Sequence, residues 1–110
     1  MTTWKHAERE IARLLGGKRS GPTGVSQVDV EHEELAIEVK HRKTAFPKWI
    51  NRGMEQANEH GEKNNKIPIL VVHEHGTPYL ESHVIMSLET FKKEFLFPFG
   101  STEKIDVPLL

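Results

Sequence analysis

Two carboxylates and a lysine stand at spacings that could serve metal-assisted phosphate chemistry. Asp29 lies in the segment VDV, and Glu38 and Lys40 lie in the segment AIEVK. Both segments alternate apolar and polar residues, which is the period of a half-buried strand. A turn between Glu33 and Glu34 would set Asp29 opposite Glu38, with Cβ atoms about 5 Å apart on one sheet surface. Lys40 would project from that same face.

Two acids that face each other across a hairpin need a compensating cation. A divalent metal ion bound by both carboxylates, or the ammonium group of Lys40, would offset the repulsion. Glu8 is a third candidate, because it lies within the apolar stripe of a predicted helix, where a carboxylate costs free energy unless it is paired or binds a metal. Glu8, Asp29 and Glu38 could thus form a site of oxygen ligands suited to Mg²⁺, with Mn²⁺ as a substitute.

These residues also have purely structural interpretations. The two strand acids could face solvent, and Glu38 could form a surface ion pair with Lys40. Glu8 could lie at the boundary of the core and pair with Lys5 or Arg9. A further group, His73-Glu74-His75, has the spacing of a zinc motif but lacks further ligands of regular spacing, so we expect a polar turn there.

The elements that must position these residues alternate between helix and strand. Apolar residues recur at the helical period over 4–15, and Gly16-Gly17 closes that helix. The pattern then predicts strands over about 25–31 and 35–41, a helix from Pro47 to Gly61, a central strand over 68–72, a strand over 79–86, a short helix from Ser87 and an irregular tail over 98–110. This order predicts an α/β fold with a mixed sheet and a single domain over 1–110.

Composition excludes several classes of protein. The 110 residues are 36% hydrophobic and 28% charged, as in an ordinary globular domain. The absence of cysteine excludes a disulfide framework, a thiolate zinc site and a cysteine nucleophile. No apolar run reaches the roughly 20 residues of a membrane span, and the first residues are too charged for a secretory signal, so we expect a cytoplasmic protein with no membrane partner.

The net charge of −1 gives no indication of a nucleic-acid partner, but the placement of the charges does. From Val39 to Met54 the chain has no acid and five cations, which are Lys40, Arg42, Lys43, Lys48 and Arg52. Lys18 and Arg19 add positive charge on the other side of the candidate site. A basic strip beside an acidic pocket is typical of phosphodiester binding; a solvated charged face is the alternative. Phe46 and Trp49 could stack on DNA or anchor the helix.

Taken together, these motifs resemble the PD-(D/E)XK nuclease superfamily. The segments that carry the resemblance are EREI from Glu8, RS at Arg19, VDV and AIEVK, and it covers residues 4 to about 73. Within that superfamily the sequence is most similar to archaeal-type Holliday junction resolvases and their small phage relatives. The resemblance implies a restriction-endonuclease-like α-β-β-β-α-β core with a mixed central sheet flanked by helices.

The resemblance also implies a role for each matching residue. The metal-binding carboxylates would be Glu8, Asp29 and Glu38, and the catalytic lysine Lys40. Arg9 and Arg19 would contact DNA phosphates, and Gln56 resembles a glutamine of the second helix in several branches of the superfamily.

The sequence therefore predicts a Mg²⁺-dependent DNA endonuclease, with a homodimeric Holliday junction resolvase as the leading interpretation. Its partners would be branched or double-stranded DNA and a second copy of the chain, with Phe95–Phe99 as a candidate interface. It would act in the cytoplasm, that of the host if a phage encodes it. A nicking or repair-type nuclease acting on ordinary duplex, and a catalytically inactive DNA-binding module, remain open.

Overall fold

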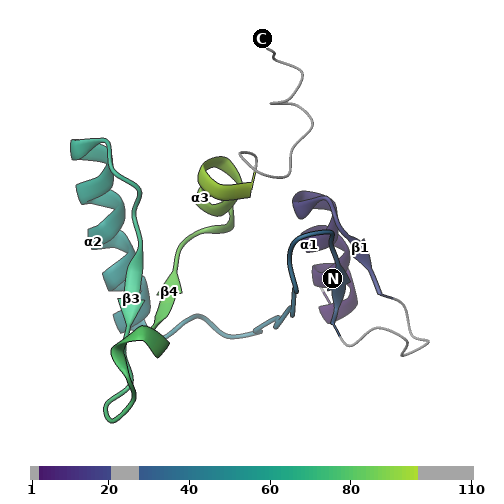
Figure 1. Ribbon diagram of the computed structural model, residues 1–110, viewed down its shortest axis with the longest axis horizontal. Coiled ribbons are helices and arrows are strands. Elements are labelled where there is room, and N and C mark those ends of the chain that lie inside the picture. The colour runs from purple at the N-terminus through teal and green to yellow at the C-terminus, as the bar shows by residue number, and fades with distance from the viewer. Residues whose placement is uncertain (1–2, 21–27, 97–110) are drawn as a thin grey trace. The chain divides into compact units, whose positions relative to one another are not determined.

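A computed structural model describes residues 3–20 and 28–96 of the chain (Figure 1). The chain divides into two compact units, residues 1–45 and 46–110, and each is described by itself. The described residues form three α-helices and two small antiparallel sheets, so the fold is broadly α/β. The predicted mixed sheet is not formed among them, because each two- or three-residue strand pairs with a partner in its own unit.

The first unit begins with helix α1, Trp4–Leu15. Thr3 caps its first turn, since the side-chain hydroxyl accepts a hydrogen bond from a backbone amide of that turn at 3.1 Å. Gly16 ends the helix in the left-handed conformation, with φ of 75°, which a residue without Cβ adopts at little cost. Leu15 is buried, as the apolar period predicts, and Ala12 is buried as well.

Two short strands follow α1 and lie beside it. Strand β1, Lys18–Arg19, pairs antiparallel with β2, Val30–Glu31. The other edge of β2 forms a single antiparallel bridge from Val30 to Ile37. A turn between Glu33 and Glu34, as predicted, also sets Val30 opposite Ile37, and this pair is confirmed. The side chain of Val30 is fully buried.

The ladder departs from regular pairing just before Val30. The backbone N–H groups of Asp29 and Val30 both donate to the carbonyl of Ile37, at 3.1 and 3.2 Å, which is the two-against-one pattern of a β-bulge. The N–H of Val39 then donates to the side chain of Asp29, and not to a facing strand. The expected strand over 35–41 is therefore reduced to one bridge, and Asp29 does not face Glu38 across a regular ladder. Of the strand expected over 25–31, residues 25–27 lie outside the described residues.

The second unit is built on a long helix and a short hairpin (Figure 1). Its elements are α2 (Lys48–Asn64), β3 (Leu70–Val72), a 3₁₀ turn (Tyr79–Glu81), β4 (His83–Ile85), α3 (Leu88–Phe91) and a π-helical turn (Lys92–Leu96). Helix α2 starts directly after Pro47, as predicted. It continues past Gly61, the expected stop, to a left-handed Asn65 with φ of 55°.

Strand β3 packs against α2 through a small residue. A Cβ placed on Gly53 would lie 2.8 Å from a methyl carbon of Leu70, so the helix approaches the strand closely there. Strand β4 pairs antiparallel with β3, and Val71 lies opposite Val84. The prediction of a central strand covered on both faces is wrong for the described residues: β3 has one partner strand, and Val71 is 56% exposed. The strand expected over 79–86 shortens because Pro78 begins the 3₁₀ turn.

Gly17 is the residue where close approach of the backbone is strictest in the first unit. A Cβ on Gly17 would lie 2.5 Å from the carbonyl oxygen of Glu31 and 2.8 Å from Val30 Cγ1. We expect Gly17→Ala to lower the free energy of unfolding by about 2–3 kcal/mol in urea titrations, as overpacking at a tight contact does. Gly16→Asn is the control, because nothing lies within 4 Å of that position and asparagine tolerates the left-handed region. Equal losses in the two variants would contradict this assignment.

Candidate functional site

The Asp29 carboxylate is fixed by the bulge that precedes Val30. Its Oδ2 accepts a hydrogen bond from the backbone N–H of Val39 at 2.7 Å, a length typical of a charge-assisted bond. Bulges often redirect a side chain in this manner next to active sites. The bond holds Asp29 against the backbone between Glu38 and Lys40, so three of the predicted site residues are brought to one segment.

Glu38 and Lys40 form an ion pair at the surface. Lys40 Nζ lies 3.2 Å from Glu38 Oε2, and the side chains are 83% and 54% exposed, respectively. A pair this exposed contributes little to folding stability. Both groups are therefore accessible to a ligand without the fold depending on their mutual contact.

Glu8 is buried, as its position in the apolar stripe predicts, but its partner is not one of those expected from the sequence. Arg19 Nε donates to Glu8 Oε1 at 2.8 Å, and the two side chains are 26% and 10% exposed. The expected alternatives, Lys5 and Arg9, lie on the same helix, whereas Arg19 comes from β1. The ion pair thus ties α1 to β1.

The three predicted metal ligands do not come together. Among residues 3–20 and 28–96, no group of three or more acidic or histidine side chains could hold a metal ion. The pairing of β2 separates them. Arg19, which binds Glu8, pairs with Val30 along one edge of β2, and Ile37, next to Glu38, bridges to Val30 along the other edge. Mg²⁺ in proteins often takes one or two carboxylates, with water and a phosphate in the remaining positions. Asp29 and Glu38 fit that donor set, whereas Glu8 is engaged by Arg19.

An unsatisfied hydroxyl lies next to Asp29. The Oγ of Ser20 is buried and has no hydrogen-bond partner in the described part of the chain, while the Ser20 N–H donates to the Asp29 carbonyl at 3.0 Å. A buried hydroxyl without a partner is unfavourable. A water molecule or a hydrated cation at this end of β2 would satisfy it.

The predicted DNA-binding cations of the first unit lie mostly at its surface. Arg9, Lys18 and Lys43 are exposed. Arg42 is exposed too, but its guanidinium donates to the Thr44 hydroxyl at 3.2 Å and to the Ala45 carbonyl at 3.0 Å. Arg42 therefore also shapes the segment that leads into the second unit.

The other predicted DNA-binding residues lie on α2. Lys48, Arg52 and Gln56 are exposed and four residues apart, so they share one face of the helix. The basic strip that is continuous in the sequence is thus divided, with Lys40, Arg42 and Lys43 in the first unit and Lys48 and Arg52 in the second.

The histidine group after β3 forms a polar turn, as predicted. The Nε2 of His73 lies 2.9 Å from the carbonyl oxygen of Thr77, and its ring stacks on Tyr79 with centroids 4.1 Å apart. The described residues contain no metal-holding group here either.

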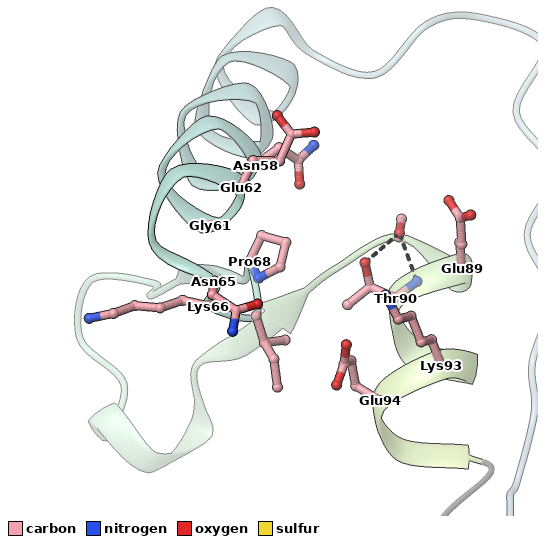
Figure 2. A pocket seen from close by; sticks show the side chains of 12 residues that line it. Asn58, Gly61, Glu62, Asn65, Lys66, Pro68, Glu89, Thr90, Lys93 and Glu94 are labelled. Carbon is pink, nitrogen blue, oxygen red and sulfur yellow. Dashed lines mark hydrogen bonds between the residues drawn. The ribbon is translucent and has the colours of Figure 1, made fainter.

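The second unit contains a hollow of about 830 Å³ that no predicted site residue lines. Figure 2 shows it between the second half of α2, with Asn58 and Glu62, and the start of α3. There the N–H of Thr90 donates a hydrogen bond to the hydroxyl of Ser87 at 3.0 Å. Its charged side chains are of both signs, including Lys66 and Glu94. This mixture favours neither a phosphate nor a metal ion.

Sequence reasoning assigned Trp4 to the buried stripe of the first helix, but the ring is 56% exposed. Two cations lie close to it: Lys5 Nζ is 5.4 Å and Arg19 Cζ is 6.0 Å from the ring centroid. The spacing of four residues from Trp4 to Glu8 could have indicated these contacts, because it places the ring one helical turn from the acid that binds Arg19.

Searches among protein-family models, curated proteins and solved structures find no match to this chain. None of the described helices is long and apolar enough to cross a membrane.

The contribution of the Glu8–Arg19 pair to stability can be compared with that of an exposed ion pair within α1, Glu10–Arg13. Arg13 donates to Glu10 at 2.8 Å as well, but these side chains are 67% and 43% exposed, and the hydrogen bond lowers the pKa of Glu10. We expect Arg19→Met to cost about 2–3 kcal/mol in urea unfolding, because it leaves a buried carboxylate without its donor. Arg13→Met should cost much less, because an ion pair at the surface contributes little to stability. A loss of the same size in both variants would contradict the assignment.

Proposed function

We propose that this chain is a Mg²⁺-dependent DNA endonuclease that hydrolyses phosphodiester bonds and is selective for four-way junctions. The observation that carries the proposal is the 2.7 Å bond from the Val39 N–H to Asp29. It holds one carboxylate against the segment that presents Glu38 and Lys40 to solvent. Two acids and a lysine on an accessible edge are the groups that metal-assisted phosphate hydrolysis uses.

Each residue of the site would have a different role in hydrolysis. When bound, Mg²⁺ would supply the positive charge that polarises the phosphate and lowers the pKa of a nucleophilic water. Asp29, with Oδ2 bonded to the Val39 N–H, would bind the ion through its second oxygen, and Glu38 would join it from its surface ion pair. Lys40, released from Glu38, would orient the attacking water or neutralise charge that develops on the phosphate.

The exposed cations support DNA as the substrate. Lysine and arginine contacts to phosphates position a duplex but read no base sequence. Selectivity then comes from shape: each chain carries one site, and a junction has two symmetric scission points, so a two-fold dimer would match it. Of the predicted interface segment, Phe95 is 37% exposed and Leu96 is buried, while 97–99 lie outside the described residues.

An inactive DNA-binding module is a second candidate, and one observation favours it. Glu8, which the nuclease family would use as a metal ligand, is occupied by Arg19 at 2.8 Å. A module of this kind would bind DNA with or without Mg²⁺ and cut nothing. A nicking or repair-type nuclease would instead cut matched duplex as fast as a junction.

The test is cleavage of a labelled four-way junction, a matched duplex and a single strand, each with Mg²⁺ and with EDTA. We expect paired, symmetric nicks in the junction with Mg²⁺ and none with EDTA. Asp29→Asn and Glu38→Gln should each lower the cleavage rate at least about 100-fold, since a ligand of the metal is lost. Their DNA affinity should be equal or higher, because each change removes negative charge near the phosphate.

Glu33→Gln is the matched control, because Glu33 is an exposed carboxylate in the turn that precedes Ile37. This variant should cleave at the rate of the unmodified chain. Native rates in either site variant would refute the assignment of the site. Light scattering measures whether the chain is a monomer or a dimer. If a monomer cuts junction and duplex at equal rates, junction selectivity is refuted and a general nuclease remains.

The face of α2 that carries Lys48 and Arg52 makes a separate prediction. Replacing both by alanine should weaken binding to all DNA sequences alike and reduce the slope of log affinity against log salt by about 0.9 for each lost duplex contact. Lys63→Ala with Lys66→Ala is the control, because it removes the same charge from two exposed positions, one in the last turn of α2 and one just after the helix. An unchanged slope in the first variant would show that this face is merely solvated.

A further inference from the structure

An exposed aromatic ring lies in the first turn of α1, in the first unit. Trp4 is 56% exposed, although the helix that carries it buries Ala12 and Leu15 on its other turns. Burying a tryptophan ring stabilises a fold more than burying most other side chains. The core of this unit does not use that contribution, so the ring is open to a ligand.

Positive charge surrounds the ring. Lys5 Nζ lies 5.4 Å and Arg19 Cζ lies 6.0 Å from its centroid, both within the usual range of a cation–π contact. The first turn of α1 contains no acid. Glu8, one turn further along, has its charge compensated by Arg19. A ligand that reaches Trp4 therefore meets a half-exposed ring with two cations over it, 5.4 and 6.0 Å from its centroid.

Arg19 joins this ring to Glu8 and to strand β2. Its Nε donates to Glu8 at 2.8 Å while its guanidinium carbon faces the Trp4 ring. The backbone of Arg19, in β1, also pairs with Val30, the residue that follows Asp29. Arg19 is therefore held by contacts with the helix and with the strand, and its guanidinium lies over the ring.

We infer that Trp4, Lys5 and Arg19 form a binding site for an unpaired nucleotide of DNA, with the base stacked on Trp4 and its phosphate on the two cations. Aromatic faces among cations are the general means by which proteins bind single-stranded nucleic acid. The inference rests on the proposed function for the choice of DNA as partner. It adds a preference to it: junctions, flaps or gaps with an unpaired base bind more tightly than a perfect duplex, in which every base is stacked internally.

Trp49 provides an internal comparison. It is 57% exposed, nearly the same as Trp4, and it too stands among cations in the sequence. Within the described residues, however, no lysine or arginine stacks on the Trp49 ring, whereas two approach that of Trp4. The chain therefore carries a matched tryptophan at a site that we do not assign to a nucleotide.

The experiment measures binding without cleavage. Trp49→Phe leaves Trp4 as the sole tryptophan, and Trp4→Phe leaves Trp49. Both full-length variants are titrated in EDTA with a single-stranded oligothymidine and with a matched duplex, and tryptophan fluorescence is followed. We expect the single strand to quench Trp4 strongly and Trp49 weakly, and the duplex to quench Trp4 little. Trp4→Ala should weaken binding of the single strand about 5- to 150-fold, the range for the loss of one stacked base.

Two controls keep the result interpretable if Trp4→Ala proves unstable. Trp4→Leu retains an apolar side chain without a large π surface and should lose the same affinity, and Trp49→Ala should lose little. Equal quenching of both tryptophans, unchanged affinity in Trp4→Leu, or duplex binding as tight as single-strand binding would each overturn the inference. The proposed function fails separately: absence of Mg²⁺-dependent cutting with quenching of Trp4 intact would refute the nuclease and retain the nucleotide site.

Discussion

The burial of Val30 is the constraint on which the first unit depends. This residue is fully buried, pairs with Arg19 on one side and bridges to Ile37 on the other. Gly17, in the turn after α1, approaches it closely. A β-branched side chain enclosed in this way cannot shift by one residue without exposing itself and burying a neighbour. The register of β2 therefore fixes where every polar residue around it lies.

One consequence is the separation of the acids. Because Val30 has a strand neighbour on each side, Arg19 takes Glu8 on one side, and Asp29 turns to the Val39 amide on the other. The first is a mostly buried ion pair, in which removal of either partner leaves an uncompensated charge. The bond from the Val39 amide to Asp29 leaves Glu38 and Lys40 at the surface, where their ion pair adds little to stability. The groups that could do chemistry are thus those on which the fold depends least.

The division into two units bears on how DNA would be bound. The first unit holds the carboxylates, Lys40 and the exposed Trp4, and the second presents Lys48 and Arg52 on one face of α2. Contacts from lysine and arginine to phosphates do not read base sequence, so the cations of each unit could by themselves add to the affinity for DNA. Arg42, bonded to the carbonyl of Ala45, shapes the segment where the first unit ends.

The sequence by itself determined the elements whose signals are local. Residue type and periodicity predict the stop at Gly16, the helix after Pro47 and the Val30–Ile37 register, because each depends on neighbours close in the chain. The buried position of Glu8 was also predictable from its place in the apolar stripe. Tertiary structure alone decided the rest. The partner of Glu8 comes from another element, Asp29 leaves the ladder for a backbone amide, and Trp4 stays exposed although its spacing matches the core. Periodicity gives the face on which a residue lies, but charge pairing and bulges depend on which atoms meet when separate segments pack.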